Sequence, residues 1–249
     1  RPLMMIPSLL AILAVSMPVA AADNTDPKSS NSNTQANTPA DKYLWLEDVT
    51  GERSLDWVRE KNEASTKQLA GSEEFTQLRD DIKAILDSDD KIPTVSKIGD
   101  RYYNFWQDAE NPRGIWRRTT MAEYRKKNPA WETVLDIDAL NKAENENWVW
   151  HGASCLKPAN ERCLIALSRG GSDSDVTREF DIKEKAWVKD GFFRPEAKGA
   201  LSWIDQDHVF ATTDFGKGTM TESGYAREVR RWRRGTPMSD AKMVFEVGV

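Results

Sequence analysis

A series of short, strand-like segments after Pro93 constrains the fold more than any other feature of this sequence. Before Pro93 the apolar residues recur at helical spacing, whereas beyond it they alternate with polar residues and turn signals separate the segments, which is typical of all-β proteins. The segments fall into three groups of four. Equivalent points such as 148–150 and 201–203 lie about fifty residues apart, which is the period of propeller blades, each a four-stranded sheet. The pattern predicts a mainly β fold built of about three propeller blades.

Each expected blade is bounded by turn-rich sequence. The blades are predicted at about 93–138, 147–190 and 199–249. Their expected strands are 94–98, 101–107, 114–120, 131–136, 148–153, 163–168, 176–181, 186–189, 200–204, 208–213, 227–232 and 243–246. Because propellers typically close with four to eight blades, three blades form an incomplete ring. Its exposed blade faces predict poor solubility of this polypeptide on its own.

Two helices are expected ahead of the strands, in a helical segment at 41–92. The polar-rich pattern of 52–69 suits a partly exposed helix. A second helix is expected to begin after Ser72, a good N-cap residue that two glutamates follow in the first turn. Its apolar residues recur at helical spacing until Pro93 ends the pattern, and they are Phe75, Leu78, Ile82 and Ile85.

The N-terminal forty residues predict export rather than a folded domain. Arg1 precedes an apolar run and the small residues 20–22, which together resemble a secretory signal peptide at 1–22. A transmembrane anchor is the alternative, but Pro7 and Pro18 interrupt a run that is shorter than the roughly 20 residues that span a bilayer. Residues 23–40 are rich in Asn, Ser and Thr and predict a disordered linker. We therefore expect a periplasmic or extracellular protein with no stable membrane span after signal removal.

Composition excludes one class of partner. The chain has 249 residues, of which 39% are hydrophobic, enough for a substantial core. Its net charge of −5 argues against a nucleic-acid partner, which requires a cationic face to displace the counterions of the phosphates.

The two cysteines, Cys155 and Cys163, lie close together in the sequence and flank a turn-rich segment. An exported protein can oxidise such a pair to a disulfide if the flanking strands form a hairpin. Two buried free thiols are the alternative, because cross-strand geometry can forbid the bond. The sequence leaves both possibilities open.

Four segments together resemble the prolyl oligopeptidase family of serine peptidases, over the range from about Asp41 to the last residue. They are YLWLED from Tyr43, RYYNFWQDAENPRGIWRRT from Arg101, LSRGGSDSDVTREFDI from Leu167 and TESGYAREVRRWRRGTP from Thr221. The resemblance implies a seven-bladed propeller that follows an N-terminal helical segment. It also implies an α/β-hydrolase domain, which carries the catalytic Ser, Asp and His and against which the helical segment packs. Trp45 and Trp57 are candidates for that contact.

The resemblance places the whole catalytic machinery outside this chain. We expect the triad downstream of Val249, with the α/β-hydrolase domain absent from this chain, so the chain alone is expected to be inactive. The parent protein is expected to hydrolyse short peptides, often after Pro in this family, with basic-residue specificity also open. The propeller would gate access to the active site. The alternative is a non-catalytic exported propeller that binds peptides or proteins, because propellers commonly serve as binding modules.

One motif imitates a catalytic one. Gly170-Gly171-Ser172-Asp173-Ser174 resembles the Gly-x-Ser-x-Gly nucleophile elbow, which is a strand-to-helix turn with small residues on both sides of Ser. Here Ser174 takes the place of the last Gly and a strand is expected to follow, so we interpret the segment as a hairpin turn. His151 and His208 lie in expected strands and are interpreted as packed or hydrogen-bonded at blade edges. No cofactor or metal is expected, because the Cys and His spacings do not match a zinc site.

Two further groups of charged residues have structural interpretations. In the basic run 227–234, strand alternation divides the arginines between two faces, which favours a solvated strand. A ligand site for peptide carboxylates at Arg231 and Arg233 is the alternative. Asp136, Asp138 and Asp181 are expected in turns rather than as paired catalytic carboxylates.

Overall fold

The computed structural model describes residues 41–248, so the expected signal peptide and linker lie outside the described residues. The described part forms two compact units that meet within one helix, after Asn62. The first unit contains the 3-10 helix Leu44–Glu47 and the first part of α1 (Glu52–Leu69). Ser54, which is buried, donates a hydrogen bond of 3.0 Å to the carbonyl of Trp45. The Trp45 and Trp57 rings meet edge to face at 6.3 Å between centroids.

The second unit begins with the end of α1 and with α2 (Glu73–Asp87), which starts where its capping signal predicts. The Ser72 hydroxyl accepts a hydrogen bond of 3.1 Å from the Phe75 N–H, which satisfies one of the free donors at the helix start. Four apolar side chains at helical spacing remain exposed, namely Phe75, Leu78, Ile82 and Ile85. The apolar stripe of α2 is thus uncovered among the described residues.

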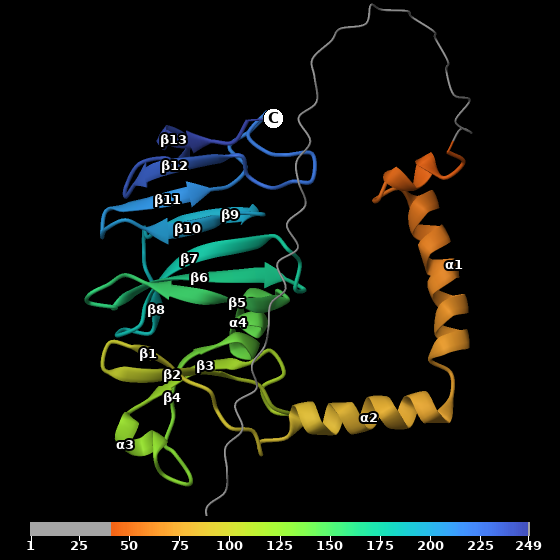
Figure 1. Cartoon of the computed structure of the whole chain (residues 1–249), viewed down its shortest axis with the longest axis horizontal. Coiled ribbons are helices and arrows are strands. Elements are labelled where there is room, and N and C mark those ends of the chain that lie inside the picture. The colour runs from red at the N-terminus through yellow and green to blue at the C-terminus, as the bar shows by residue number, and fades with distance from the viewer. Residues whose placement is uncertain (1–40, 249) are drawn as a thin grey trace, which may run out of the picture. The chain divides into compact units, whose positions relative to one another are not determined.

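Three antiparallel sheets make up the rest of this unit and lie one above another in chain order (Figure 1). Blade 1 consists of β1 (Ser96–Ile98), β2 (Arg101–Trp106), β3 (Ile115–Thr119) and β4 (Glu132–Asp136). Blade 2 consists of β5 (Trp148–Cys155), β6 (Arg162–Arg169), β7 (Asp175–Asp181), β8 (Ala186–Trp187) and β9 (Phe193–Ala197). Blade 3 consists of β10 (Ala200–Trp203), β11 (His208–Thr212), β12 (Glu228–Arg233) and β13 (Lys242–Glu246). The mainly β, propeller-type architecture is as predicted.

The strand order within each sheet follows the chain, except that β9 pairs with β7 beside β8. Every predicted strand is present, with ends within one or two residues of the expected bounds. The short elements β9, α3 (Met121–Tyr124), α4 (Ile137–Glu144) and the 3-10 helices Leu44–Glu47 and Met238–Asp240 were not predicted. Pro195 lies inside β9, and proline lowers the strand signal of a segment because it cannot donate to the ladder.

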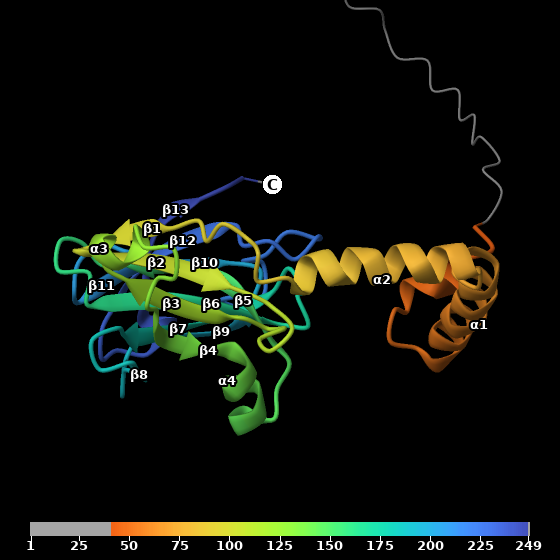
Figure 2. The ribbon, with the colours of Figure 1, turned by 90° about the horizontal axis from the view of Figure 1, so that it is seen from below.

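A correction concerns Asp136 and Asp138, which do not lie in a turn. Asp136 ends β4 and caps α4 (Ile137–Glu144), its carboxylate accepting a hydrogen bond of 2.8 Å from the Ala139 N–H. Asp138 is in the first turn of α4 and accepts from the Gly114 N–H at 3.2 Å. Figure 2 shows α4 continuing from the end of β4. The helix forms because its buried Ile137 packs into the core between blades 1 and 2. Asp181, in contrast, accepts from two N–H groups of the turn after β7, as predicted.

Apolar side chains fill the spaces between adjacent blades. One cluster joins blades 1 and 2, and within it Phe105 stacks on Trp150 with 5.1 Å between ring centroids. A second cluster joins blades 2 and 3 and contains Phe192, which meets Trp232 at 5.1 Å. Strand alternation sends every second side chain into these layers, so blade 2, which lies between the other two, contributes apolar side chains from both of its faces.

Candidate functional site

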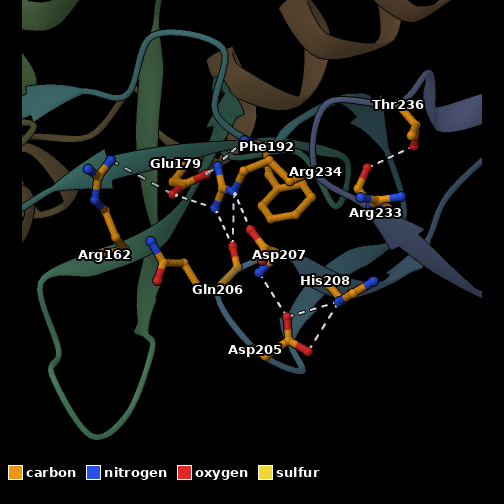
Figure 3. Close-up of polar contacts among 10 residues, drawn as sticks. All are labelled: Arg162, Glu179, Phe192, Asp205, Gln206, Asp207, His208, Arg233, Arg234 and Thr236. Carbon is orange, nitrogen blue, oxygen red and sulfur yellow. Dashed lines mark hydrogen bonds and ion pairs between the residues drawn. The ribbon is translucent and has the colours of Figure 1, made fainter.

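Glu179 of β7 is an almost fully enclosed carboxylate at the contact between blades 2 and 3, with a side-chain exposure of 1%. Two nitrogens of Arg234 donate to its carboxylate at 2.8 and 3.0 Å, and the Phe192 N–H donates at 2.9 Å (Figure 3). On the other side, the Arg162 guanidinium lies 4.0 Å away. A buried carboxylate requires such partners, because desolvation of an unpaired charge is costly. We call this group the Glu179–Arg234 clamp.

The sequence around Arg234 explains why it reaches blade 2. Arg234 follows directly after β12, in the connection to β13 of the same blade. Its backbone N–H donates to the Asp207 carbonyl at 2.7 Å, and its guanidinium donates to the Gln206 carbonyl at 2.7 and 3.0 Å. The same guanidinium lies 4.5 Å from the centre of the Phe192 ring. One side chain thus joins the β10–β11 loop, β7 and the segment before β9.

A second ionic contact joins blades 1 and 2. Glu132 of β4 accepts from Arg118 of β3 at 2.7 and 3.0 Å and pairs with Lys185 of the β7–β8 turn at 2.6 Å. The hydrogen bonds from Arg118, and then that from Lys185, lower the pKa of Glu132 to about 2. Arg118 also donates to the Ile182 carbonyl at 2.9 Å, so it bridges the two blades.

The segment Gly170 to Ser174 lies in the β6–β7 hairpin turn, as its sequence predicts, and β7 follows it. The Ser172 hydroxyl donates to the Ser174 carbonyl at 2.9 Å. Neither histidine is the hydrogen-bond partner of a Ser hydroxyl. His151 Nδ1 lies 3.4 Å from Asp175, and His208 Nδ1 lies 3.0 Å from Asp205. The described residues therefore hold no Ser–His pair.

The histidines and the basic run lie where the sequence predicts, with one exception. His151 is in β5 and His208 begins β11, while Arg231 and Arg233 lie on the exposed face of β12. The exception is Arg234, which we interpreted as part of a solvated strand. It lies beyond the end of β12 and forms the clamp instead. Neither Glu179 nor Arg234 was singled out from the sequence, because a pair 55 residues apart leaves no local signal.

Cys155 and Cys163 face each other across the β5–β6 pair and are joined by a disulfide. The β5–β6 register places the two cysteines directly opposite each other. The sequence alone left open whether they form a bridge or remain two free thiols. Within residues 41–248 no group of three or more Cys, His, Asp or Glu side chains is arranged to hold a metal ion. In the same range no helix is long and apolar enough to cross a membrane.

Residues 22–248 match the family model described as the prolyl oligopeptidase N-terminal β-propeller domain. The chain belongs to the prolyl oligopeptidase family. The observed stack of antiparallel sheets, two of four strands and one of five, agrees with this assignment.

Relatives of this family share both sequence and fold with the chain. It is 38% identical over 217 residues to an uncharacterized peptidase of Sinorhizobium fredii, covering 87% of this chain and 30% of the relative. It is 32% identical to an uncharacterized peptidase of Rickettsia prowazekii, covering 82% of this chain and 29% of the relative. A solved post-proline cleaving enzyme from Rickettsia typhi is 33% identical with a TM-score of 0.74, covering 82% and 30% of the two chains. The chain thus spans less than a third of the length of these peptidases.

A more distant solved structure shares the fold alone. Oligopeptidase B from Leishmania major is 17% identical to this chain, with a TM-score of 0.61 over 82% of this chain and 28% of its own. Its likeness extends the fold assignment to sequences that have diverged widely from this one.

Proposed function

We propose that this chain is the N-terminal propeller part of an exported serine oligopeptidase that hydrolyses short peptides, and that its propeller gates access of substrate. The observation that carries the proposal is the family match over residues 22–248, together with peptidase relatives of which the chain covers 29 to 30%. In a protein of that length, a nucleophile, a base and an orienting acid would lie in the part that follows the propeller. The reaction would be acyl transfer through a Ser–His–Asp triad.

The contacts between blades support a gating role. A propeller excludes large substrates only if adjacent blades stay together, so that peptides enter by a restricted opening. The Glu179–Arg234 clamp and the Glu132–Lys185 pair each join two adjacent blades, and apolar clusters fill the space between them. These contacts favour a rigid wall over a flexible one.

The exposed apolar stripe of α2 supports an attached hydrolase domain as the intramolecular partner. Phe75, Leu78, Ile82 and Ile85 are between 41% and 70% exposed. Soluble proteins rarely leave a contiguous row of large apolar side chains in water. A hydrolase domain that packs on α2 would cover this row.

The disulfide supports export. Disulfides persist in oxidising compartments and are rare in the cytosol. Cys155 and Cys163 form one, and the sequence before residue 23 has the pattern of a secretory signal. We infer a periplasmic or extracellular location. Fractionation of the source cells, with N-terminal sequencing of the mature protein, tests this: a cytosolic protein that retains residues 1–22 would contradict it.

The proposed activity is tested on the longer protein encoded by the source gene. Chromogenic peptides with Pro, Arg or Ala before the leaving group measure hydrolysis and specificity. A serine-reactive phosphonate probe should label the longer protein and abolish turnover. A series of peptides of increasing length, each with one cleavage site, tests the gate: kcat/KM should fall sharply with length.

Two results would contradict the proposal in different ways. Hydrolysis of long and short peptides at equal kcat/KM would contradict the gating role but leave the peptidase activity supported. Peptide binding without any turnover or probe labelling would remove the peptidase and favour a binding module.

A further inference from the structure

One face of blade 3 carries four cationic or titratable side chains around an exposed phenylalanine. Cross-strand pairing places Phe210 opposite Arg231, His208 opposite Arg233, and Arg231 opposite Lys242, so these residues share one face. The opposite face holds the buried Val209, Ala211 and Trp232, which pack toward blade 2. We call the first face, formed by Arg231, Arg233, Lys242, His208 and Phe210, the cationic face.

The cationic face has little negative charge of its own. Among the described residues, Arg231, Arg233 and Lys242 form no ion pair. A shallow hollow on this face is lined by these three, by His208 and Thr236, and by one carboxylate, that of Asp240. His208 is paired with Asp205 at the strand end. Three exposed charges of one sign on neighbouring strands repel one another, which is unfavourable unless a partner of opposite charge covers them.

Both contacts between blades in this chain follow one order of charge. The preceding blade supplies a carboxylate and the following blade supplies the cation: Glu132 of blade 1 with Lys185 of blade 2, and Glu179 of blade 2 with Arg234 of blade 3. On the cationic face this order is reversed, because blade 3 presents cations, not carboxylates, on the side that faces away from blade 2. A blade of the same pattern would bring further cations against it. An element that covers this face would need carboxylates opposite these cations.

We propose that the cationic face is an interaction surface for an acidic sheet face, supplied by the blade that follows β13 in the longer protein. The proposal rests on the proposed place of this chain in a longer peptidase. Carboxylates opposite Arg231, Arg233 and Lys242 neutralise the like charges, and an apolar position between them packs on Phe210, which is 41% exposed.

A second copy of this chain, joined through the same face, does not fit the cationic face. Two copies joined through the same face would place Arg231, Arg233 and Lys242 against their own equivalents. This arrangement opposes cations to cations, which is destabilising.

Zero-length cross-linking of the longer protein tests the proposal directly. A carbodiimide joins a lysine amine to a carboxylate only where the two are in contact. We expect Lys242 to be joined to an Asp or Glu that lies after residue 249 of the same molecule, with peptides identified by mass spectrometry. A mixture of isotope-labelled and unlabelled protein separates links within a molecule from links between copies.

Matched charge reversals test whether Arg231 and Arg233 bind the proposed acidic face. The double variant Arg231→Glu/Arg233→Glu should lose the Lys242 cross-link. Arg125→Glu/Lys127→Glu makes the same change at two exposed residues of blade 1 that form no ion pair among residues 41–248, and it should retain the link. If the first variant does not fold, the cross-link in the unaltered protein still decides the question.

Three results would overturn the proposal. Lys242 could link only to carboxylates within residues 41–248, or it could link only between copies. It could also remain unlinked and be acetylated by a soluble ester as fast as the exposed Lys217. Peptidase activity, measured separately on the same preparation, shows whether the proposed function fails as well.

Discussion

At the scale of single residues, the blades are joined by a few ionised side chains whose partners are distant in sequence. Glu179 is buried, yet it accepts three hydrogen bonds from Arg234 and Phe192, so its charge is compensated. Removing one member of such a pair costs more than the pair itself contributes, because the other member is left desolvated. The clamp is therefore expected to be sensitive to substitution of either partner.

We expect Glu179→Gln to lower the free energy of unfolding by about 2–3 kcal/mol, near the lower end of the range for breaking a buried pair, because Arg234 remains partly exposed. Urea unfolding followed by tryptophan fluorescence measures the change. Glu184→Gln, at an exposed residue of the β7–β8 turn, is the matched control and should stay within about 0.5 kcal/mol of the parent. Adding Arg234→Met to Glu179→Gln should cost less than Arg234→Met alone; additive losses would argue against the clamp.

Glu132 gives the contact between blades 1 and 2 a dependence on pH. Its pKa is lowered to about 2 by Arg118 and Lys185, whereas a glutamate in the unfolded chain titrates near ~4.3. A lowered carboxyl pKa means that its stabilisation is present above the unfolded value and is lost as pH falls from ~4.3 toward 2. Because the Glu132 side chain is 43% exposed, we expect about 1 kcal/mol or less.

This pH dependence is measured as the free energy of unfolding between pH 5 and pH 2. Glu132→Gln should flatten the decline relative to the parent, while Glu184→Gln should leave it unchanged. Equal slopes for the parent and Glu132→Gln would show that Glu132 does not couple blades 1 and 2 to pH.

At the scale of elements, local signals predicted most of what formed. Ser72 caps α2 as expected, and the strands follow the alternation of the sequence. The missed elements have weak local patterns: α4 is eight residues long, and β9 contains Pro195. Each is stabilised by a tertiary contact. The buried Ile137 of α4 packs in the core between blades 1 and 2, and β9 pairs with β7.

The β5–β6 hairpin carries the prediction at this scale. Cys155 and Cys163 have a sequence separation of 8. Closing so short a loop lowers the conformational entropy of the unfolded chain, which stabilises the folded state by about 2.5 kcal/mol on the chain-entropy estimate. We expect Cys155→Ser/Cys163→Ser to lose about this amount of unfolding free energy, and reductant to do the same to the parent but not to the double variant. Alkylation of two thiols in native protein before reduction would contradict the bridge.

At the scale of the whole molecule, the described part combines three packed blades with surfaces that lack a cover. The apolar stripe of α2 and the cationic face of blade 3 are both exposed, and the chain spans about 30% of its peptidase relatives. These surfaces are of different chemistry, so one partner does not suit both. The proposed longer protein, with a hydrolase domain and further blades, would cover each of them.

We expect the 249-residue chain by itself to show no turnover of a proline-containing chromogenic peptide, because its described residues hold no Ser–His pair. The longer protein, assayed under the same conditions, is the control for substrate and buffer. Turnover by the pure 249-residue chain that a serine-reactive probe abolishes would show that the Gly170 to Ser174 interpretation is wrong.

The sequence by itself determined the fold class, the number of sheets, the start of α2 and the turn at Gly170 to Ser174, because hydrophobic period, capping and turn chemistry act between near neighbours in the chain. Only the tertiary structure decided that Arg234 meets Glu179, that Cys155 faces Cys163, and that Arg231 and Lys242 share an open face. These depend on strand register and on how one sheet packs against the next. A shift of register by one residue would turn these side chains to the other face of the sheet, and the free energy of the contacts depends on the burial that packing creates rather than on local pattern.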